Sequence, residues 1–103
     1  MELPEPQTLT IGDMELDVER GRLSKGRLSR QLGPMKFRIM TIFGQYPNRT
    51  LSEERLRLAL YGEEYRTESA LRSNITGCRR IIRSLRSKAQ IKGTPHYGWE
   101  FIP

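Results

Sequence analysis

Residues 71–86 read LRSNITGCRRIIRSLR, and the spacing of their apolar members decides how this chain folds. These members recur at steps of four, three, four and three: Leu71, Ile75, Cys78, Ile82 and Leu85. Apolar residues at such spacing share one side of an α-helix and turn it toward a core. The pattern predicts a long amphipathic helix over residues 68–86 with a narrow buried seam.

The side of this helix opposite the seam is predicted to carry short hydroxyl side chains and arginines. At about 100° per residue, the positions that face away from the seam include Ser69, Ser73, Thr76 and Arg80. One flank carries a row of cations: Arg72, Arg79, Arg83 and Arg86. Arginine, serine and threonine can all donate hydrogen bonds to base edges in a major groove, whereas flanking cations suit phosphates. We therefore expect the first set to face bases and the second set, with Lys92, to contact phosphates.

Charge is distributed unevenly along the chain, which has 103 residues, a net charge of +6 and a pI of about 10.0. No Asp or Glu lies between Ser69 and Trp99, although that stretch holds seven lysines and arginines. From Ser69 onward the helix thus carries one sign of charge and none of the Glu–Arg pairs that support a merely solvated helix. This favours an anionic partner such as nucleic acid.

The rest of the chain supplies a small sheet, two further helices and a hairpin. Alternating apolar residues broken by glycine turns predict three or four short antiparallel strands over residues 9–32. Gly33-Pro34 begins a first helix that ends before Pro47, and Ser52 caps a second that ends at Tyr61-Gly62. The apolar positions of that second helix are predicted to be Leu56, Leu58, Ala59 and Leu60. Residues 90–102 predict a hairpin. We expect residues 1–8 to be a flexible arm and residues 9–103 to form one domain.

Several single residues could have either a structural or a functional role. The only cysteine, Cys78, lies on the seam and is predicted to be a core residue in a reducing compartment. His96, also the only one of its type, is expected to be an exposed turn residue or a phosphate contact. The alternating aromatic residues Tyr97, Trp99 and Phe101 are predicted to pack in the core rather than stack on bases. Gly77 is expected to admit a sugar-phosphate strand close to the helix.

No pattern of catalytic or metal-binding residues is present in the sequence. We expect a protein without enzyme activity, cofactor, bound metal or small-molecule substrate. There is no apolar run of about 18 residues and no secretory signal, so we expect no membrane contact and a cytoplasmic, nucleoid-associated location.

Six segments stand in the order, and near the spacing, of one known family. Residues 11–17 (IGDMELD) resemble its opening strand and residues 32–40 (LGPMKFRIM) its L-T-P-x-E-F-x-L-L helix entry. Residues 48–52 resemble its G-x-x-x-S step, and Leu60-Tyr61-Gly62 stands where it has Leu-Trp-Gly. Residues 71–79 fit its V-x-V-H-I-x-x-L-R recognition helix with one gap, and residues 91–101 fit its I-x-T-V-R-G-x-G-Y-x-F wing. Residues 9–102 thus resemble the effector domains of OmpR/PhoB-type response regulators. The resemblance implies an α+β winged helix-turn-helix with a four-stranded N-terminal sheet, three helices and a C-terminal β-hairpin wing.

The departures from this family concern the wing, the register and the missing receiver domain. Pro95-His96 replaces the family's Arg-Gly, which leaves Lys92, Thr94 and His96 as candidate wing contacts. A register shifted by seven residues also keeps the seam buried, but the first register fits the loop and wing lengths better. No receiver domain is present, so the chain is either a fragment or a stand-alone protein, and Met1 before a short arm favours the second.

We therefore expect a bacterial or phage transcription regulator that binds double-stranded DNA sequence-specifically. Residues 68–86 would enter the major groove, with the wing, residues 91–102, near the backbone or minor groove. The resemblance further implies tandem homodimers on DNA and contact of the Glu63–Glu64 loop with RNA polymerase. Two alternatives stay open: an excisionase-like protein that bends DNA, and an adaptor that docks on RNA polymerase or another regulator. A binder of single strands or RNA is a third.

Overall fold

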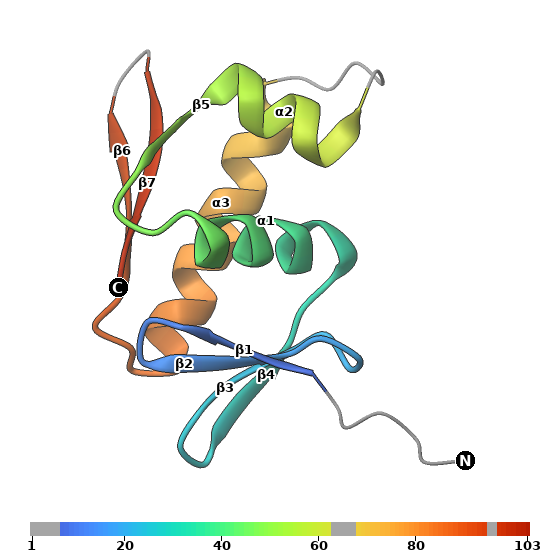
Figure 1. Cartoon of the computed structure of the whole chain (residues 1–103), viewed down its shortest axis with the longest axis vertical. Coiled ribbons are helices and arrows are strands. Elements are labelled where there is room, and N and C mark those ends of the chain that lie inside the picture. The colour runs from blue at the N-terminus through green and yellow to red at the C-terminus, as the bar shows by residue number, and fades with distance from the viewer. Residues whose placement is uncertain (1–6, 63–67, 95–96) are drawn as a thin grey trace.

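A computed structural model of the chain describes residues 7–62, 68–94 and 97–103, without the side chains of residues 68 and 69. These residues form two sheets and three helices (Figure 1). The N-terminal elements are β1 (Thr8–Ile11), β2 (Met14–Asp17), β3 (Arg22–Lys25), β4 (Leu28–Gln31) and α1 (Pro34–Gln45). The C-terminal elements are β5 (Thr50–Ser52), α2 (Glu53–Tyr61), α3 (Glu68–Ser84), β6 (Gln90–Thr94) and β7 (Gly98–Ile102). β1 thus begins one residue inside the segment expected to be an arm.

The first sheet is an antiparallel meander in the order β1-β2-β3-β4. Its strands turn at Gly12, Gly21 and Gly26, whose φ angles of 62°, 62° and 58° suit residues without a Cβ. The alternation predicted from sequence is present, because Ile11 and Leu16 are buried on one face while Thr10 and Glu15 are exposed. The four-stranded sheet is confirmed.

Local signals set the ends of the first two helices as predicted. Pro34 opens α1, where its missing N–H costs no hydrogen bond. The Ser52 hydroxyl accepts a hydrogen bond from the Arg55 backbone N–H at 3.1 Å, which caps α2. Gly62 lies at the C-terminal cap of α2 with a φ of 62°.

The long helix α3 packs against α1 and buries its whole predicted seam. Leu71, Ile75, Cys78, Ile82 and Leu85 are each at most 2% exposed. The helix ends at Ser84, earlier than expected, because the backbone then turns into the left-handed region at Arg86, with a φ of 58°. Ser87 N–H donates to the Ile82 carbonyl and Arg86 N–H to the Arg83 carbonyl, the two bonds of a Schellman motif.

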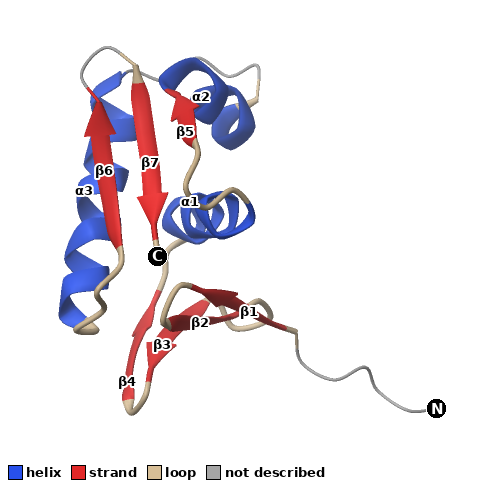
Figure 2. Ribbon diagram, turned by 60° about the vertical axis from the view of Figure 1, so that its left-hand side comes forward, coloured by secondary structure: helices blue, strands red, loops and turns tan. Residues whose placement is uncertain are grey.

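The second sheet has the order β5-β7-β6, one strand more than the predicted hairpin. Residues 50–52 were expected only to lead into α2, but they pair with β7, so that Thr50 lies opposite Glu100 and Ser52 opposite Gly98. Figure 2 shows β6 beside α3, with β7 and β5 leading across to α1 and α2. In the same view, the first sheet (β1–β4) lies below these elements, at one end of the molecule.

Some residues predicted to be buried lie at the surface. Leu58 is 62% exposed and Ala59 is also exposed, because the short helix α2 packs only through the side that carries Leu56 and Leu60. Tyr97 is 68% exposed, since it precedes β7. Trp99 is half-buried and Phe101 fully buried, where its ring stacks on Phe43 at 6.2 Å. The core prediction is therefore wrong for Leu58, Ala59 and Tyr97.

No helix in the described ranges is long and apolar enough to cross a membrane.

Candidate nucleic-acid interface

The outward side of α3 carries a single stripe of exposed polar side chains. Its exposed members are Arg72, Ser73, Thr76, Arg80 and Arg83. They lie opposite the seam, because the seam is buried against α1 and the rest of the core. The stripe therefore combines hydroxyl groups and guanidinium groups on one accessible surface. Ser73, Thr76 and Arg80 can reach a ligand, as base contact requires.

Arg79, on the flank of the stripe, is partly committed to the fold. Its Nε–H donates a hydrogen bond to the Ile91 carbonyl oxygen in β6 at 2.9 Å. This bond joins α3 to the hairpin, and it explains why Arg79 is half-buried whereas Arg80 and Arg83 are exposed. Phosphate contact by Arg79 stays a prediction. Because Nε–H is bonded to the Ile91 carbonyl, such a contact would have to be made by the terminal Nη1 and Nη2 groups.

An acidic side chain from another element lies beside the stripe. Glu53 Oε1, in the first turn of α2, is 4.0 Å from Nε of Arg72. The Glu53 side chain is 20% exposed and that of Arg72 is 60% exposed, so Arg72 still faces solvent. The charge of one sign inferred from sequence holds along α3 from Arg72 onward, but not for its surroundings, since a carboxylate is supplied by the preceding helix.

A cleft of about 420 Å³ lies between α3, the first turn of α2 and the β6–β7 hairpin. Its polar lining includes Glu53, Arg72, Thr76, Arg79, Thr94 and Trp99. Gly93 keeps part of it open, because a Cβ there would lie 3.1 Å from Trp99 Nε1 and 3.4 Å from Arg79 Nη2. Indole and guanidinium N–H donors thus border a gap that a side chain at position 93 would narrow. The Glu53 carboxylate lines the same cleft, so its polar lining carries both signs of charge.

Gly77 lies on the opposite flank and serves packing within the protein. A Cβ at this position would overlap Cε of Lys36, a residue of α1. The structure thus gives Gly77 a neighbour within the protein, the flexible end of the Lys36 side chain, and the close approach of a sugar-phosphate strand stays a prediction.

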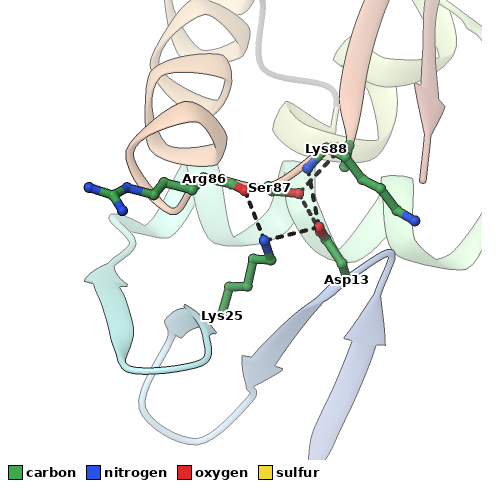
Figure 3. A network of polar contacts seen from close by, with 6 residues as sticks. Asp13, Lys25, Arg86, Ser87 and Lys88 are labelled. Carbon is green, nitrogen blue, oxygen red and sulfur yellow. Dashed lines mark hydrogen bonds and ion pairs between the residues drawn. The ribbon is translucent and has the colours of Figure 1, made fainter.

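The C-terminal end of α3 is tied to the first sheet by a polar network (Figure 3). The Asp13 carboxylate accepts hydrogen bonds from the Ser87 hydroxyl and, at 3.1 Å, from the Lys88 backbone N–H. Lys25 Nζ lies 3.6 Å from that carboxylate and donates to the Arg86 carbonyl at 2.8 Å. Burial raises the pKa of Asp13, but the hydrogen bonds and the charge of Lys25 outweigh it, so the net pKa is lowered. Nothing in the sequence around Asp13 indicated this role.

The remaining predicted positions divide between exposed, buried and undescribed residues. Arg86, Lys92 and Thr94 are exposed. Cys78 is buried as predicted, and burial raises the pKa of its thiol to about 12, which Lys36 only partly offsets. His96, Glu63 and Glu64, with the side chain of Ser69, lie outside the described residues. Within the described part, no three His, Cys, Asp or Glu side chains are placed to hold a metal ion.

Solved structures share this arrangement over nearly the whole chain. The DNA-binding domain of Escherichia coli CadC superposes with a TM-score of 0.85 at 17% identity, covering 95% of both chains. The C-terminal domain of the nisin resistance regulator NsrR gives 0.79 at 24% identity, covering 92% of this chain and 97% of that one. The Klebsiella pneumoniae RstA DNA-binding domain, solved with the RstA box, gives 0.73 at 18% identity, covering 94% and 98%. No protein-family model and no curated protein matches the chain.

The similarity is one of fold, since identity is low while the superposition spans nine-tenths of the chain or more. The order of first sheet, three helices and hairpin, predicted from six short sequence segments, is confirmed. The chain has the winged helix-turn-helix fold found in the DNA-binding domains of response regulators of the OmpR/PhoB type.

Proposed function

We propose that this protein is a transcription regulator that binds double-stranded DNA sequence-specifically. The exposed stripe of α3 enters the major groove, and the β6–β7 hairpin lies along the adjoining backbone. The observation that carries the proposal is this stripe, Arg72 to Arg83, which projects from the third helix of a winged helix-turn-helix fold.

The stripe offers the side-chain chemistry that duplex recognition requires. Arg80 lies close to the middle of the outward side and can form two hydrogen bonds with a guanine edge, while Ser73 and Thr76 can bond bases or phosphates. Arg83, Arg86 and Lys92 are exposed cations near this surface that can contact phosphates and so orient the helix. The structurally similar RstA DNA-binding domain was solved in complex with the RstA box, which supports DNA binding by the same fold in this protein.

The first experiment selects duplexes from a random pool and then measures affinity against a scrambled duplex over a range of salt concentrations. An enriched motif bound about a thousandfold more tightly than scrambled DNA at physiological salt would support a site-specific regulator. Failure to enrich any motif, with affinity that falls steeply as salt rises, would contradict it and leave only electrostatic binding.

Two neighbouring arginines then separate base contact from phosphate contact. Arg80→Ala should cost about 1–3 kcal/mol on the selected site and relax the base preference at one position. Arg83→Ala is the matched control, since it removes another exposed guanidinium from the same helix. It should weaken binding to all duplexes alike and lower the salt slope by about one. An equal loss on all sequences in both variants would rule out base contact by Arg80.

A further inference from the structure

A groove on the other side of the hairpin sheet has no role in the proposed DNA contact. It measures about 310 Å³ and lies between the C-terminal end of α1, the segment leading into β5, and α2. We call it the α1–α2 groove. Its apolar floor is formed by Ile42, Leu51, Leu56 and Ala59. Figure 2 shows α1, α2 and β5 on one side of the molecule, with α3 and β6 on the other.

The rim of this groove is aromatic and cationic. Tyr46 is 47% exposed, and Arg49 and Arg55 are exposed on either side of β5. Within the described part of the chain, neither guanidinium has an acidic partner, and no carboxylate lines the groove. An apolar centre with tyrosine and arginine around it has the composition of protein interfaces, where these two residue types are enriched.

One leucine of α2 that does not line the groove is also exposed. Leu58, one residue before Ala59, is 62% exposed and is among the most exposed large apolar side chains in the described residues.

From this arrangement we infer that the α1–α2 groove docks an acidic amphipathic segment of a partner protein. The apolar side chains of that segment occupy the floor, and its carboxylates pair with Arg49 and Arg55. Charge complementarity determines this choice, because the groove supplies two cations without a partner and no acid. Since no residue of α3, β6 or β7 lines the groove, we expect the partner to bind while DNA occupies the recognition surface. The inference is independent of whether that surface reads a particular DNA sequence.

The test uses the full chain and a fluorescent peptide of about 12 residues that is built as an amphipathic helix, with Leu and Trp on one face and Glu on the other. One control peptide replaces Glu by Lys, and a second replaces Leu and Trp by Ser. We expect the first peptide alone to bind and to shift the amide resonances of Ile42, Leu51 and Ala59. Binding of the lysine peptide with equal affinity, or no binding of the first peptide, would overturn the proposal.

Variants distinguish this groove from the arginines of α3, which could attract any acidic peptide. The double variant Arg49→Glu/Arg55→Glu should weaken peptide binding by about tenfold or more. Ala59→Trp should block the groove from an exposed helix position without entering the core. Arg83→Glu, the control on α3, should weaken binding to duplex DNA and leave peptide affinity unchanged. Displacement of the peptide by duplex, or loss of peptide binding in Arg83→Glu alone, would place the peptide on α3 and overturn the inference.

Discussion

Arg79 of α3 donates its Nε–H to the carbonyl oxygen of Ile91 in β6 at 2.9 Å. Among the described strands, β6 pairs only with β7, so its other edge has carbonyl groups without a strand partner. Arg79 satisfies one of these groups and holds the hairpin against the helix. The relative placement of α3 and the hairpin, on which simultaneous contact with groove and backbone depends, therefore rests partly on this side chain.

Removing this bond should affect stability as well as DNA binding. Arg79→Ala leaves the carbonyl oxygen of the buried residue Ile91 without this donor, and we expect the free energy of unfolding to fall by about 1–3 kcal/mol. Denaturant titration measures this change. Arg83→Ala, which removes an exposed arginine from the next turn, should alter the free energy of unfolding by no more than about 0.5 kcal/mol. Equal stability of the two variants would show that the Arg79–Ile91 bond does not support the fold.

Arg86 offers a way to separate stability from phosphate contact. Its φ of 58° is one that glycine adopts without steric cost and arginine does not. Arg86→Gly should raise the free energy of unfolding by about 1 kcal/mol, whereas Arg86→Ala keeps the strain and should leave it nearly unchanged. Both variants lack the guanidinium, so both should bind duplex DNA more weakly if Arg86 contacts phosphate. Thermal unfolding and binding measured on the same samples decide both points, and equal stability of the two variants would contradict the strain.

The predictions from sequence succeeded where the signal is local. The seam of α3 and the Ser52 cap of α2 each depend on residues within a few positions of one another, and both are as expected. β5 was missed because it is three residues long and exists only through pairing with β7, far along the chain. Leu58 was misplaced because a short apolar run does not reveal which of its members faces the core.

The same division applies to the candidate interface. The rotation of an ideal helix was enough to assign Ser73, Thr76 and Arg80 to the outward side. It could not show that Arg79 bonds to Ile91, or that Glu53 lies beside Arg72, because each partner belongs to another element. Such pairings depend on tertiary packing, so periodicity along one helix carries no information about them.

The stability of the protein should depend on pH through Asp13. Its pKa is lowered from the ordinary value of 3.8, so its contribution is complete above that pH and is lost as the pH falls toward the lower folded-state pKa. Asp13→Asn should lower the free energy of unfolding by about 1–2 kcal/mol at neutral pH, because the hydrogen bonds to a charged acceptor are weakened. The difference from the unaltered protein should shrink as the pH falls below 3.8.

Denaturant titration across a pH series measures this dependence. Glu19→Gln serves as the control, since it neutralises an exposed carboxylate in the same part of the chain. It should change the free energy of unfolding little at any pH. A difference between Asp13→Asn and the unaltered protein that stays constant from pH 7 to below 3.8 would show that the Asp13 charge does not stabilise the fold.

Gly98 begins β7 opposite Ser52 of β5, and the backbone of β5 leaves no room for a side chain there. A Cβ at this position would overlap the carbonyl oxygen of Leu51, a backbone atom that can move only if the β5–β7 pairing opens. Gly98→Ala should therefore lower the free energy of unfolding by about 3 kcal/mol and release amide protection in β5 before α3. Gly33→Ala is the control, because a Cβ there would meet no atom within 4 Å. Hydrogen exchange measures the effect, and unchanged protection of Leu51 and Ser52 in Gly98→Ala would show that β5 is not held by this close approach.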